Sequence, residues 1–191
     1  MDNLEQQILQ LEEFLRQNYA KHLDEFVDLT LTEICTQTNS IRGIFYVVNQ
    51  DTQVAHAKAG YAINLDKLSY PVIHLGEGLT GEAIRLKQIL LFNDLAPGSI
   101  FTQTLTINLS PKGLIIIPLI FNENVYGALE LVSLSNYSET YLNYLQVVSN
   151  SITVTLQSLL NTDKMQRLLA EKAKIEVTEG VDAQSQEFFY Q

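Results

Sequence analysis

The chain has 191 residues, enough for one domain with extensions and for a sizeable hydrophobic core. Apolar residues make up 46% of the sequence and aromatic residues 9%, which is the composition of a folded globular protein rather than a disordered one. The formal net charge of −10 argues against nucleic acid and anionic membranes as partners, because both require clustered lysine and arginine.

The cysteine content and the first residues bear on the cellular compartment. Cys35 is the only cysteine, so the chain can form neither an internal disulfide framework nor a cysteine-rich metal site. The start, MDNLE, is acidic where a secretory signal would be basic and then apolar. No apolar run approaches the ~20 residues of a membrane-spanning helix. We therefore expect a soluble, cytoplasmic protein without a membrane insertion.

The N-terminal segment, residues 2–38, contains neither glycine nor proline and predicts one long helix. Its many acidic residues are typical of a solvated helix face, more than of an acidic docking surface. A broad apolar stripe between Leu23 and Ile34 is expected for a helix that lies on a sheet. An earlier, narrower stripe has the spacing of a coiled-coil seam and predicts packing on another chain: Leu4, Ile8, Leu11 and Leu15.

The middle of the chain predicts short strands separated by loops. The expected strands are 41–49, 53–59 (a candidate edge strand), 71–75 and 89–92. The motif GEGLTG at 76–81 leads into a short helix at 82–87. After Asn93-Asp94 comes a long polar stretch, 95–112, and a loop of that length inside a domain is usually functional or disordered.

The centre of the fold is predicted to be a hairpin. Strands 114–121 and 125–133 are rich in isoleucine, leucine and valine, and the polar turn 122–124 joins them. Residues 114–120 are apolar at every position, so both faces of this sheet must be covered. A second long helix begins after the N-cap candidate Ser138, loses its apolar stripe beyond Asn161 and is expected to end at Gly180.

The order of these elements and motifs resembles the GAF domain over residues 24–160. The residues that carry the resemblance are Gly76, Gly78–Gly81, Asn93-Asp94, Ile115–Leu119, Tyr126–Leu131 and Tyr137–Glu139. The resemblance implies an α+β (GAF/PAS-like) fold with a central antiparallel sheet of five or six strands. Long N- and C-terminal helices would cover one face, while loops and short helices form a small-molecule pocket on the other. Residues 1–23 and 161–191 would then be helical extensions.

The resemblance also implies a sensory module that binds a small molecule. Such a module signals through dimeric terminal helices to an effector outside this chain, for example a sensor histidine kinase, and has no catalytic residues of its own. The alternative is a ligand-free dimerisation module whose pocket is filled. The residues expected at the dimer interface are Leu4, Ile8, Leu11, Leu15, Leu156 and Leu159.

The identity of the ligand is left open by the sequence. The cyclic-nucleotide signature of the family, NKxFxDE, is missing near Asn108–Gly113, so a cyclic nucleotide is not indicated. A covalent bilin needs a pocket cysteine, whereas Cys35 lies in the first helix. Relatives that reduce free methionine sulfoxide use several cysteines, and one cannot complete that cycle. Haem at His74 is less favoured than a structural histidine, and the scattered histidines show no metal-ligand spacing.

Glu130 is the most informative candidate, because it interrupts an otherwise apolar strand and a carboxylate there must be paired or hydrogen-bonded. Alternation places Tyr126 and Glu130 on one face, toward the pocket. Glu130 could equally bond the 95–112 loop without touching a ligand, and which face of strand 41–49 lines the pocket is open. The pocket candidates are Phe45, His74, Thr80, Asn93, Asp94, Phe101, Tyr126 and Glu130.

Overall fold

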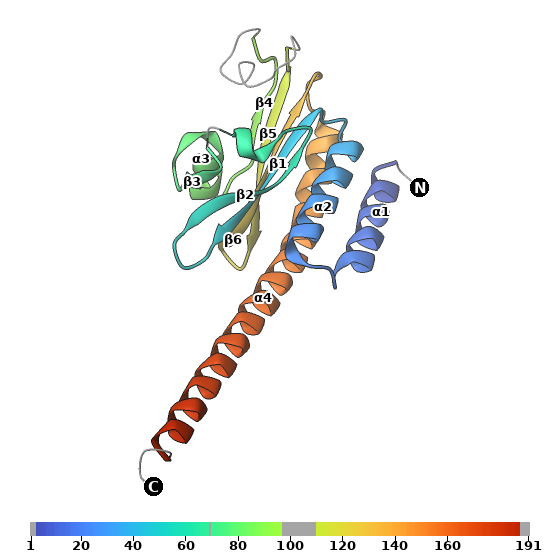
Figure 1. Cartoon of the computed structure of the whole chain (residues 1–191). Helices are drawn as coiled ribbons and strands as arrows, with labels where there is room; N and C mark the ends of the chain where they lie inside the picture. Colours follow the sequence, from blue (N-terminus) through green and yellow to red (C-terminus); the bar gives the residue numbers. More distant parts are fainter. Residues whose placement is uncertain (1–2, 69, 97–109, 188–191) are drawn as a thin grey trace.

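The computed structural model describes residues 3–68, 70–96 and 110–187, and of residues 173–187 only the backbone. An antiparallel sheet is covered by helices on both faces, so the predicted α+β class is confirmed (Figure 1). The elements in chain order are α1 (Asn3–Asn18), α2 (Leu23–Gln37), β1 (Arg42–Asn49), β2 (Val54–Tyr61), the 3-10 helix η1 (Leu65–Lys67), β3 (Val72–His74), α3 (Gly78–Leu86), β4 (Leu90–Phe92), β5 (Gly113–Phe121), β6 (Asn124–Ser133) and α4 (Glu139–Glu187).

The sheet has six strands in the order β3-β2-β1-β6-β5-β4, and every neighbouring pair is antiparallel. The predicted hairpin β5–β6 lies inside the sheet, because β6 also pairs with β1 and β5 with β4. The prediction of β2 as an edge strand is wrong, since β2 pairs with both β1 and β3. The short strands β3 and β4 form the edges, and short edge strands limit pairing with other chains.

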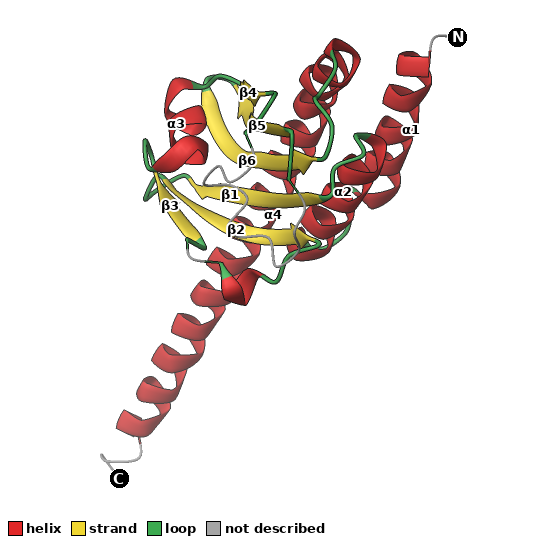
Figure 2. Ribbon diagram, turned by 90° about the horizontal axis from the view of Figure 1, so that it is seen from above, coloured by secondary structure: helices red, strands yellow, loops and turns green. Residues whose placement is uncertain are grey.

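One face of the sheet is covered by α2 and α4, and α1 lies outside them against α4 (Figure 2). The main hydrophobic core lies between these helices and the sheet. On the opposite face α3 packs against β5, β6 and β3, and η1 packs against β2. Two smaller clusters of buried residues lie on this second face, and it is here that the sheet leaves room for a cavity.

The two faces of β1 are resolved by these clusters. Phe45 and Val47 belong to the helix-side core, while Ile44, Tyr46 and Val48 belong to a cluster on the α3 side. The pocket therefore lies on the side of Ile44 and Tyr46. Phe45 is fully buried under the helices, so its predicted place in the pocket is wrong.

The N-terminal segment is two helices instead of the single helix that its composition predicts. The chain turns at residues 19–22, where His22 is extended and precedes α2. No glycine or proline forces this turn. The turn lets α1 fold back along α4, which buries Leu11 and Leu15 in the core of their own chain. Burial of that apolar stripe outweighs the small gain in helix propensity from an unbroken helix.

The predicted dimer interface is therefore wrong for the residues that are buried. Leu11, Leu15 and Leu156 are at most 4% exposed and pack within the chain. Leu4, Ile8 and Leu159 are partly buried against the same core.

The last helix, α4, continues past Gly180 to Glu187, so its predicted end is wrong. Its C-terminal part extends away from the sheet (Figure 1). Although α4 is long, none of the helices in the described residues combines the length and the hydrophobicity that crossing a bilayer requires.

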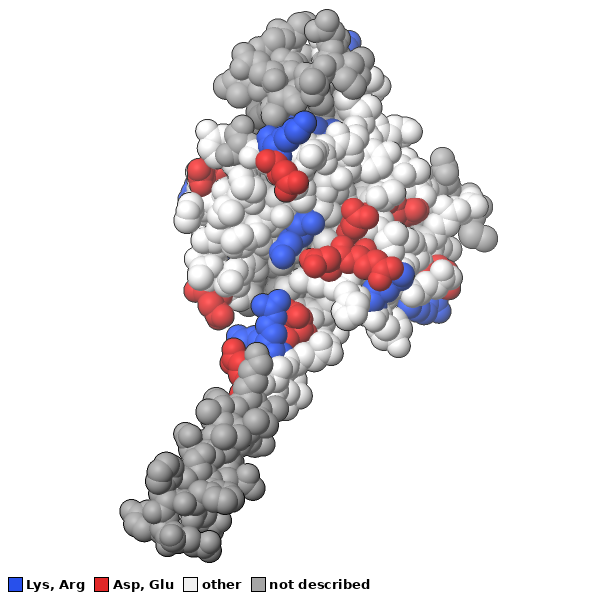
Figure 3. All heavy atoms as spheres, viewed as in Figure 1, with Lys and Arg blue, Asp and Glu red and all other residues white. Residues whose placement is uncertain are grey.

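Acidic side chains gather over α2 on the face shown in Figure 3. Asp24, Glu25 and Asp28 are exposed there, and Lys58 of β2 lies 3.9 Å from the Asp24 carboxylate. Exposed pairs of this kind contribute about 0–1 kcal/mol. The geometry is that of a solvated helix face, as the sequence predicts.

Candidate ligand-binding cavity

A cavity of about 460 Å³ lies between the sheet and α3, on the face opposite to α2 and α4. Strands β1, β5 and β6 form its floor, and the start of α3 forms one wall. Its lining is mostly aliphatic, with a few polar groups, and small-molecule sites usually have this composition. The aliphatic side chains are Ile44, Leu68, Ile73, Leu79, Leu114, Ile116 and Val132.

The wall is built by the glycine-rich motif at 76–81. Gly78 has a φ of +61°, which side-chain-bearing residues rarely adopt, so glycine allows the backbone to enter α3 at this angle. Gly81 packs against β3 so closely that a Cβ there would lie 2.3 Å from the His74 carbonyl oxygen. The motif is thus a tight connection that places the first turn of α3 over the sheet.

Glu130 enters the cavity from β6 and is held by the wall. The Thr80 hydroxyl donates a hydrogen bond to Glu130 Oε2 over 2.7 Å, which links α3 to the sheet. Both residues line the cavity, so Thr80 and Glu130 lie where the sequence places them. This bond excludes neither a contact of Glu130 with a ligand nor one with the 95–112 loop, because Thr80 uses only one of the two carboxylate oxygens of Glu130.

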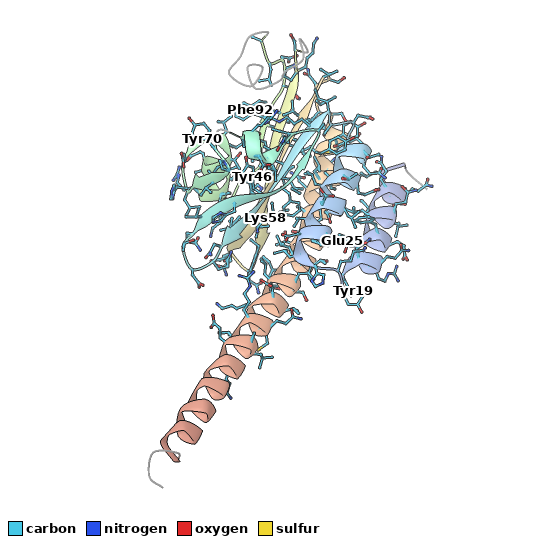
Figure 4. All side chains as sticks on the ribbon, in the orientation of Figure 1. Tyr19, Glu25, Tyr46, Lys58, Tyr70 and Phe92 are labelled. Atoms are coloured by element: carbon cyan, nitrogen blue, oxygen red, sulfur yellow. The ribbon has the colours of Figure 1, made fainter. Side chains whose placement is uncertain are left out.

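Arg42 and Tyr46 enter the same cavity from β1, and both were missed by the sequence analysis. Arg42 is 7% exposed, and its Nε is buried with no hydrogen-bond partner in the structure. Burial raises the pKa of the Tyr46 phenol, the negative charge of Glu130 raises it further, and Arg42 opposes the rise. Tyr46 lies over the middle of the sheet, and Tyr70 of the lining lies near β3 and α3 (Figure 4).

A signal for these two residues is present in the sequence, because Arg42, Ile44 and Tyr46 alternate along one strand. Once Ile44 is assigned to the cavity face, Arg42 and Tyr46 follow by the period of two.

Tyr126 lies on the other face from Glu130, so its predicted place in the pocket is wrong. Leu119 pairs with Gly127, while Ile120 pairs with Val125, which leaves Tyr126 as the extra residue of a β-bulge. A bulge interrupts the alternation of faces. Tyr126 therefore packs against the helix-side core, whereas Val125 and Ala128 share the cavity side.

The remaining candidates lie away from the cavity. His74 is exposed on the edge strand β3. Asn93 bonds both backbone groups of Tyr137, donating to its oxygen over 3.0 Å and accepting from its nitrogen over 2.9 Å. Asp94 bonds Asn136 in the same loop. Asn93-Asp94 thus clamps the end of β4 to the start of α4. Phe101 lies outside the described residues.

Cys35 belongs to α2 and is buried in the core between the helices and the sheet, and this burial raises the pKa of its thiol to about 12. This agrees with its interpretation as a small apolar core residue. Among the described residues no group of histidine, cysteine, aspartate and glutamate has the geometry to hold a metal ion.

A second depression, about 520 Å³, lies between α1 and α4. It is shallower and open, and its lining includes Tyr19 of α1 and Val154 of α4. Its position beside the exposed face of α4 marks a surface feature rather than an enclosed ligand site.

The comparisons with known proteins agree with this geometry. The GAF domain family model matches residues 20–157. No curated protein matches the sequence. Among solved structures, the chain is similar to the GAF domain of a phosphoenolpyruvate-protein phosphotransferase (ptsP) from Coxiella burnetii, with 15% identity, a TM-score of 0.69, and coverage of 85% of this chain and 99% of that one.

Two further solved structures are similar at the same level. The GAF domain of the Acinetobacter phosphoenolpyruvate-protein phosphotransferase has 14% identity and a TM-score of 0.67, covering 83% of this chain and 95% of that one. The free methionine-R-sulfoxide reductase from Neisseria meningitidis, in complex with its substrate, has 16% identity and a TM-score of 0.66, covering 83% and 91%. At these identities the likeness shows a shared fold.

Proposed function

The chain belongs to the GAF domain family, and we propose that it is a sensory module that binds a small molecule in the cavity between the sheet and α3. The binding signal would pass along α4 to an effector outside the chain, such as a histidine kinase. One observation carries the proposal: a cavity of about 460 Å³ that is lined mostly by aliphatic side chains and holds a buried arginine and a fixed carboxylate.

This volume favours ligand binding over the filled-pocket alternative. A pocket that has become part of the core would be packed to the density of a protein interior, where voids larger than a water molecule are few. It would not retain a charged group such as Arg42, because burying charge without a partner is costly. Both features support a site that a ligand completes.

The route from the cavity to α4 passes through the sheet. Leu114 and Ile116 of β5 line the cavity, while their neighbours Ile115 and Ile117 pack in the helix-side core with residues of α4. Alternate residues of one strand thus contact the ligand space and the helix. A ligand that moves β5 or β6 would change how α4 packs on the sheet, which is the differential contact that signalling requires.

We further propose that two copies of the chain pair through the exposed face of α4. Val147, Val154, Asn161 and Leu168 recur every seven residues along α4, and the valines and Leu168 are 46–53% exposed. A repeat of seven supplies one seam position per heptad of a left-handed coiled coil, and an asparagine within the seam favours one register. The face lies away from the residues that α4 buries, so a homodimer could form without disturbing the core.

Catalysis is not part of the proposal. The similar reductase acts on free methionine-R-sulfoxide, but the single cysteine of this chain is buried on the helix side, across the sheet from the cavity. Thiol chemistry in the cavity would need a sulfur atom that faces it.

Native mass spectrometry of the chain purified from its own host tests the function, because it retains bound small molecules. A stoichiometric extra mass that is lost on mild denaturation is expected. The variant Leu79→Trp fills the cavity from α3 and should abolish the extra mass. Leu86→Trp, on the same helix and outside the lining, is the matched control and should retain it. The proposal would be refuted if no extra mass were found and if no compound in a panel of metabolites and nucleotides raised the melting temperature of the chain.

A further inference from the structure

The unusual feature of the cavity is an arginine that forms no ion pair within the described residues. Arg42 is 7% exposed, and within the described part of the chain it forms none of the ion pairs, while its Nε has no hydrogen-bond partner. A guanidinium remains charged at any physiological pH. A buried charge is stable only when it is paired and hydrogen-bonded. The cavity thus presents one unsatisfied cationic group to whatever enters it.

The first turn of α3 adds to this positive pole. Gly78, Leu79 and Thr80 line the same cavity. The Gly81 amide bonds the Glu77 carbonyl, so the three amides before it precede the internal bonds of the helix. The Glu77 side chain does not cap them, since its Oε2 accepts from the His74 amide instead. An uncapped helix N-terminus favours an anion.

A negative pole lies in the same space. Glu130 is fixed by the Thr80 hydroxyl, yet it forms no ion pair with Arg42. Arg42 pairs with Val132 and Ile44 with Glu130, so the two charged residues are diagonal neighbours on one face of the β1–β6 ladder. Diagonal positions are ~7–8 Å apart and within reach of long side chains, yet the guanidinium and the carboxylate form no ion pair with each other, so both remain available to a ligand group. The charges of both act on the Tyr46 phenol.

The two poles select among ligand classes. A phosphate or another group with two negative charges is attracted by Arg42 but repelled by Glu130. A simple amine is attracted by Glu130 but repelled by Arg42, and an uncharged ligand leaves both poles without an opposite charge. A ligand with one carboxylate and one ammonium close together satisfies both poles. The third charged residue of the lining, Glu77, is exposed, and its Oε2 already accepts a hydrogen bond from the His74 amide. The aliphatic floor from Ile44, Leu114 and Ile116 then suits an apolar remainder.

We propose that the cavity binds a free α-amino acid with an apolar side chain, its carboxylate at Arg42 and the start of α3 and its ammonium at Glu130. This rests on the proposed function, because it names the ligand class of the same cavity. Arg42 and Glu130 are the residues that determine specificity, while the aliphatic lining and the cavity volume limit the size of the side chain.

Calorimetric titration of the full chain with L-leucine, L-isoleucine, L-methionine and L-phenylalanine tests the ligand class. The amino acid that binds most tightly is compared with analogues that lack one pole; for L-leucine these are 3-methylbutylamine and 4-methylpentanoate. The amino acid should bind at least about tenfold more tightly than either analogue, because each analogue leaves either Arg42 or Glu130 without an opposite charge. Inorganic phosphate and cyclic AMP should bind no better than the analogues.

Two variants assign the poles, with circular dichroism confirming the fold of each. The Arg42→Met variant should bind the amino acid only as tightly as the wild type binds the amine. The Glu130→Gln variant should bind it only as tightly as the wild type binds the carboxylic acid. Lys58→Gln, which removes an exposed cation outside the cavity, should change nothing. Equal binding of amino acid and analogues, or tight binding of phosphate or cyclic AMP, would overturn the ligand class while leaving the sensory function standing. Failure of all four amino acids to bind also overturns it, and the native mass spectrum then decides the function separately.

Discussion

The Cys35 thiol illustrates how a single buried group ties stability to pH. Burial raises its pKa from 9.0 to about 12, so the folded chain favours the neutral thiol more strongly than the unfolded chain does. The stabilising contribution is therefore fully present below the unfolded pKa and is lost as the pH rises toward the folded pKa. Burial also raises the pKa values of Tyr137 and Tyr144, which act in the same direction.

The variant Cys35→Ala should accordingly show a shallower loss of unfolding free energy in alkali. Urea denaturation at about pH 8 and about pH 10.5 measures it, and the wild type should lose more stability between these values than the variant. Tyr144 is present in both proteins and its contribution cancels, while removal of the Cys35 charge, which raises the pKa of Tyr137 in the wild type, acts in the same direction as removal of the thiol itself. At the lower pH the variant should be less stable by about 1 kcal/mol, because it loses the buried sulfur atom. Parallel losses in the two proteins would show that the thiol is not the titrating group.

At the scale of residues, the sequence predicts what depends on one strand and misses what depends on two. Glu130 could be assigned to the cavity because a lone carboxylate in an apolar strand demands a partner. Arg42 could not be singled out, because its burial depends on α3 and the neighbouring strands. Tyr126 was assigned to the wrong face because the bulge that moves it arises from the pairing with β5.

The clamp between β4 and α4 connects two elements through paired hydrogen bonds. Asn93 pairs with both backbone groups of Tyr137, which bridges positions far apart in the sequence. The Tyr137 hydroxyl in turn bonds the Ser40 hydroxyl over 2.8 Å, next to the end of α2. The entry of α4 is thus fixed both to the edge of the sheet and to α2.

Loss of this clamp should destabilise the fold without touching the cavity. Asn93→Ala should lower the unfolding free energy by about 1–3 kcal/mol, because it leaves the Tyr137 amide and carbonyl without their partner. Chemical denaturation measures the change. Asn136→Ala is the matched control, since it removes an equally paired but exposed asparagine contact with Asp94 and should lose less than about 1 kcal/mol. If the two variants lost the same amount, the clamp would have no special role.

At the scale of elements, all six strands and the presence of α3 follow from the sequence, because the alternation of apolar residues and the turn residues act locally. The predicted start of α3 at residue 82 is wrong, since the helix begins at Gly78 within the glycine-rich motif. The break between α1 and α2 does not. Neither glycine nor proline marks residues 19–22, and only the apolar stripe of α1 with its tertiary partner α4 explains the turn. The coiled-coil spacing of that stripe was genuine, but its partner is a helix of the same chain.

In the part of the chain that the structure describes, α4 extends away from the sheet, and its exposed face determines the proposed assembly. Val154 borders the depression between α1 and α4, while Leu168 lies about four turns further along α4, and the two are 47% and 53% exposed. Exposed apolar residues that continue along one face of a long helix indicate a contact with a partner. A second copy of α4 is the partner that the seven-residue repeat predicts.

The wild-type chain should therefore be a dimer in multi-angle light scattering, and Leu168→Glu should weaken it at least about tenfold, because two carboxylates would oppose each other in the apolar seam. Val154→Glu should act in the same direction from within the globular part. Gln166→Glu adds the same charge off the seam on the same helix and should leave the dimer intact. Unfolding transitions should stay close to wild type in all three variants, since each position is exposed in the single chain. A wild-type monomer, or equal dimers of Leu168→Glu and Gln166→Glu, would remove α4 as the dimer contact and leave signal transmission to α4 within one chain.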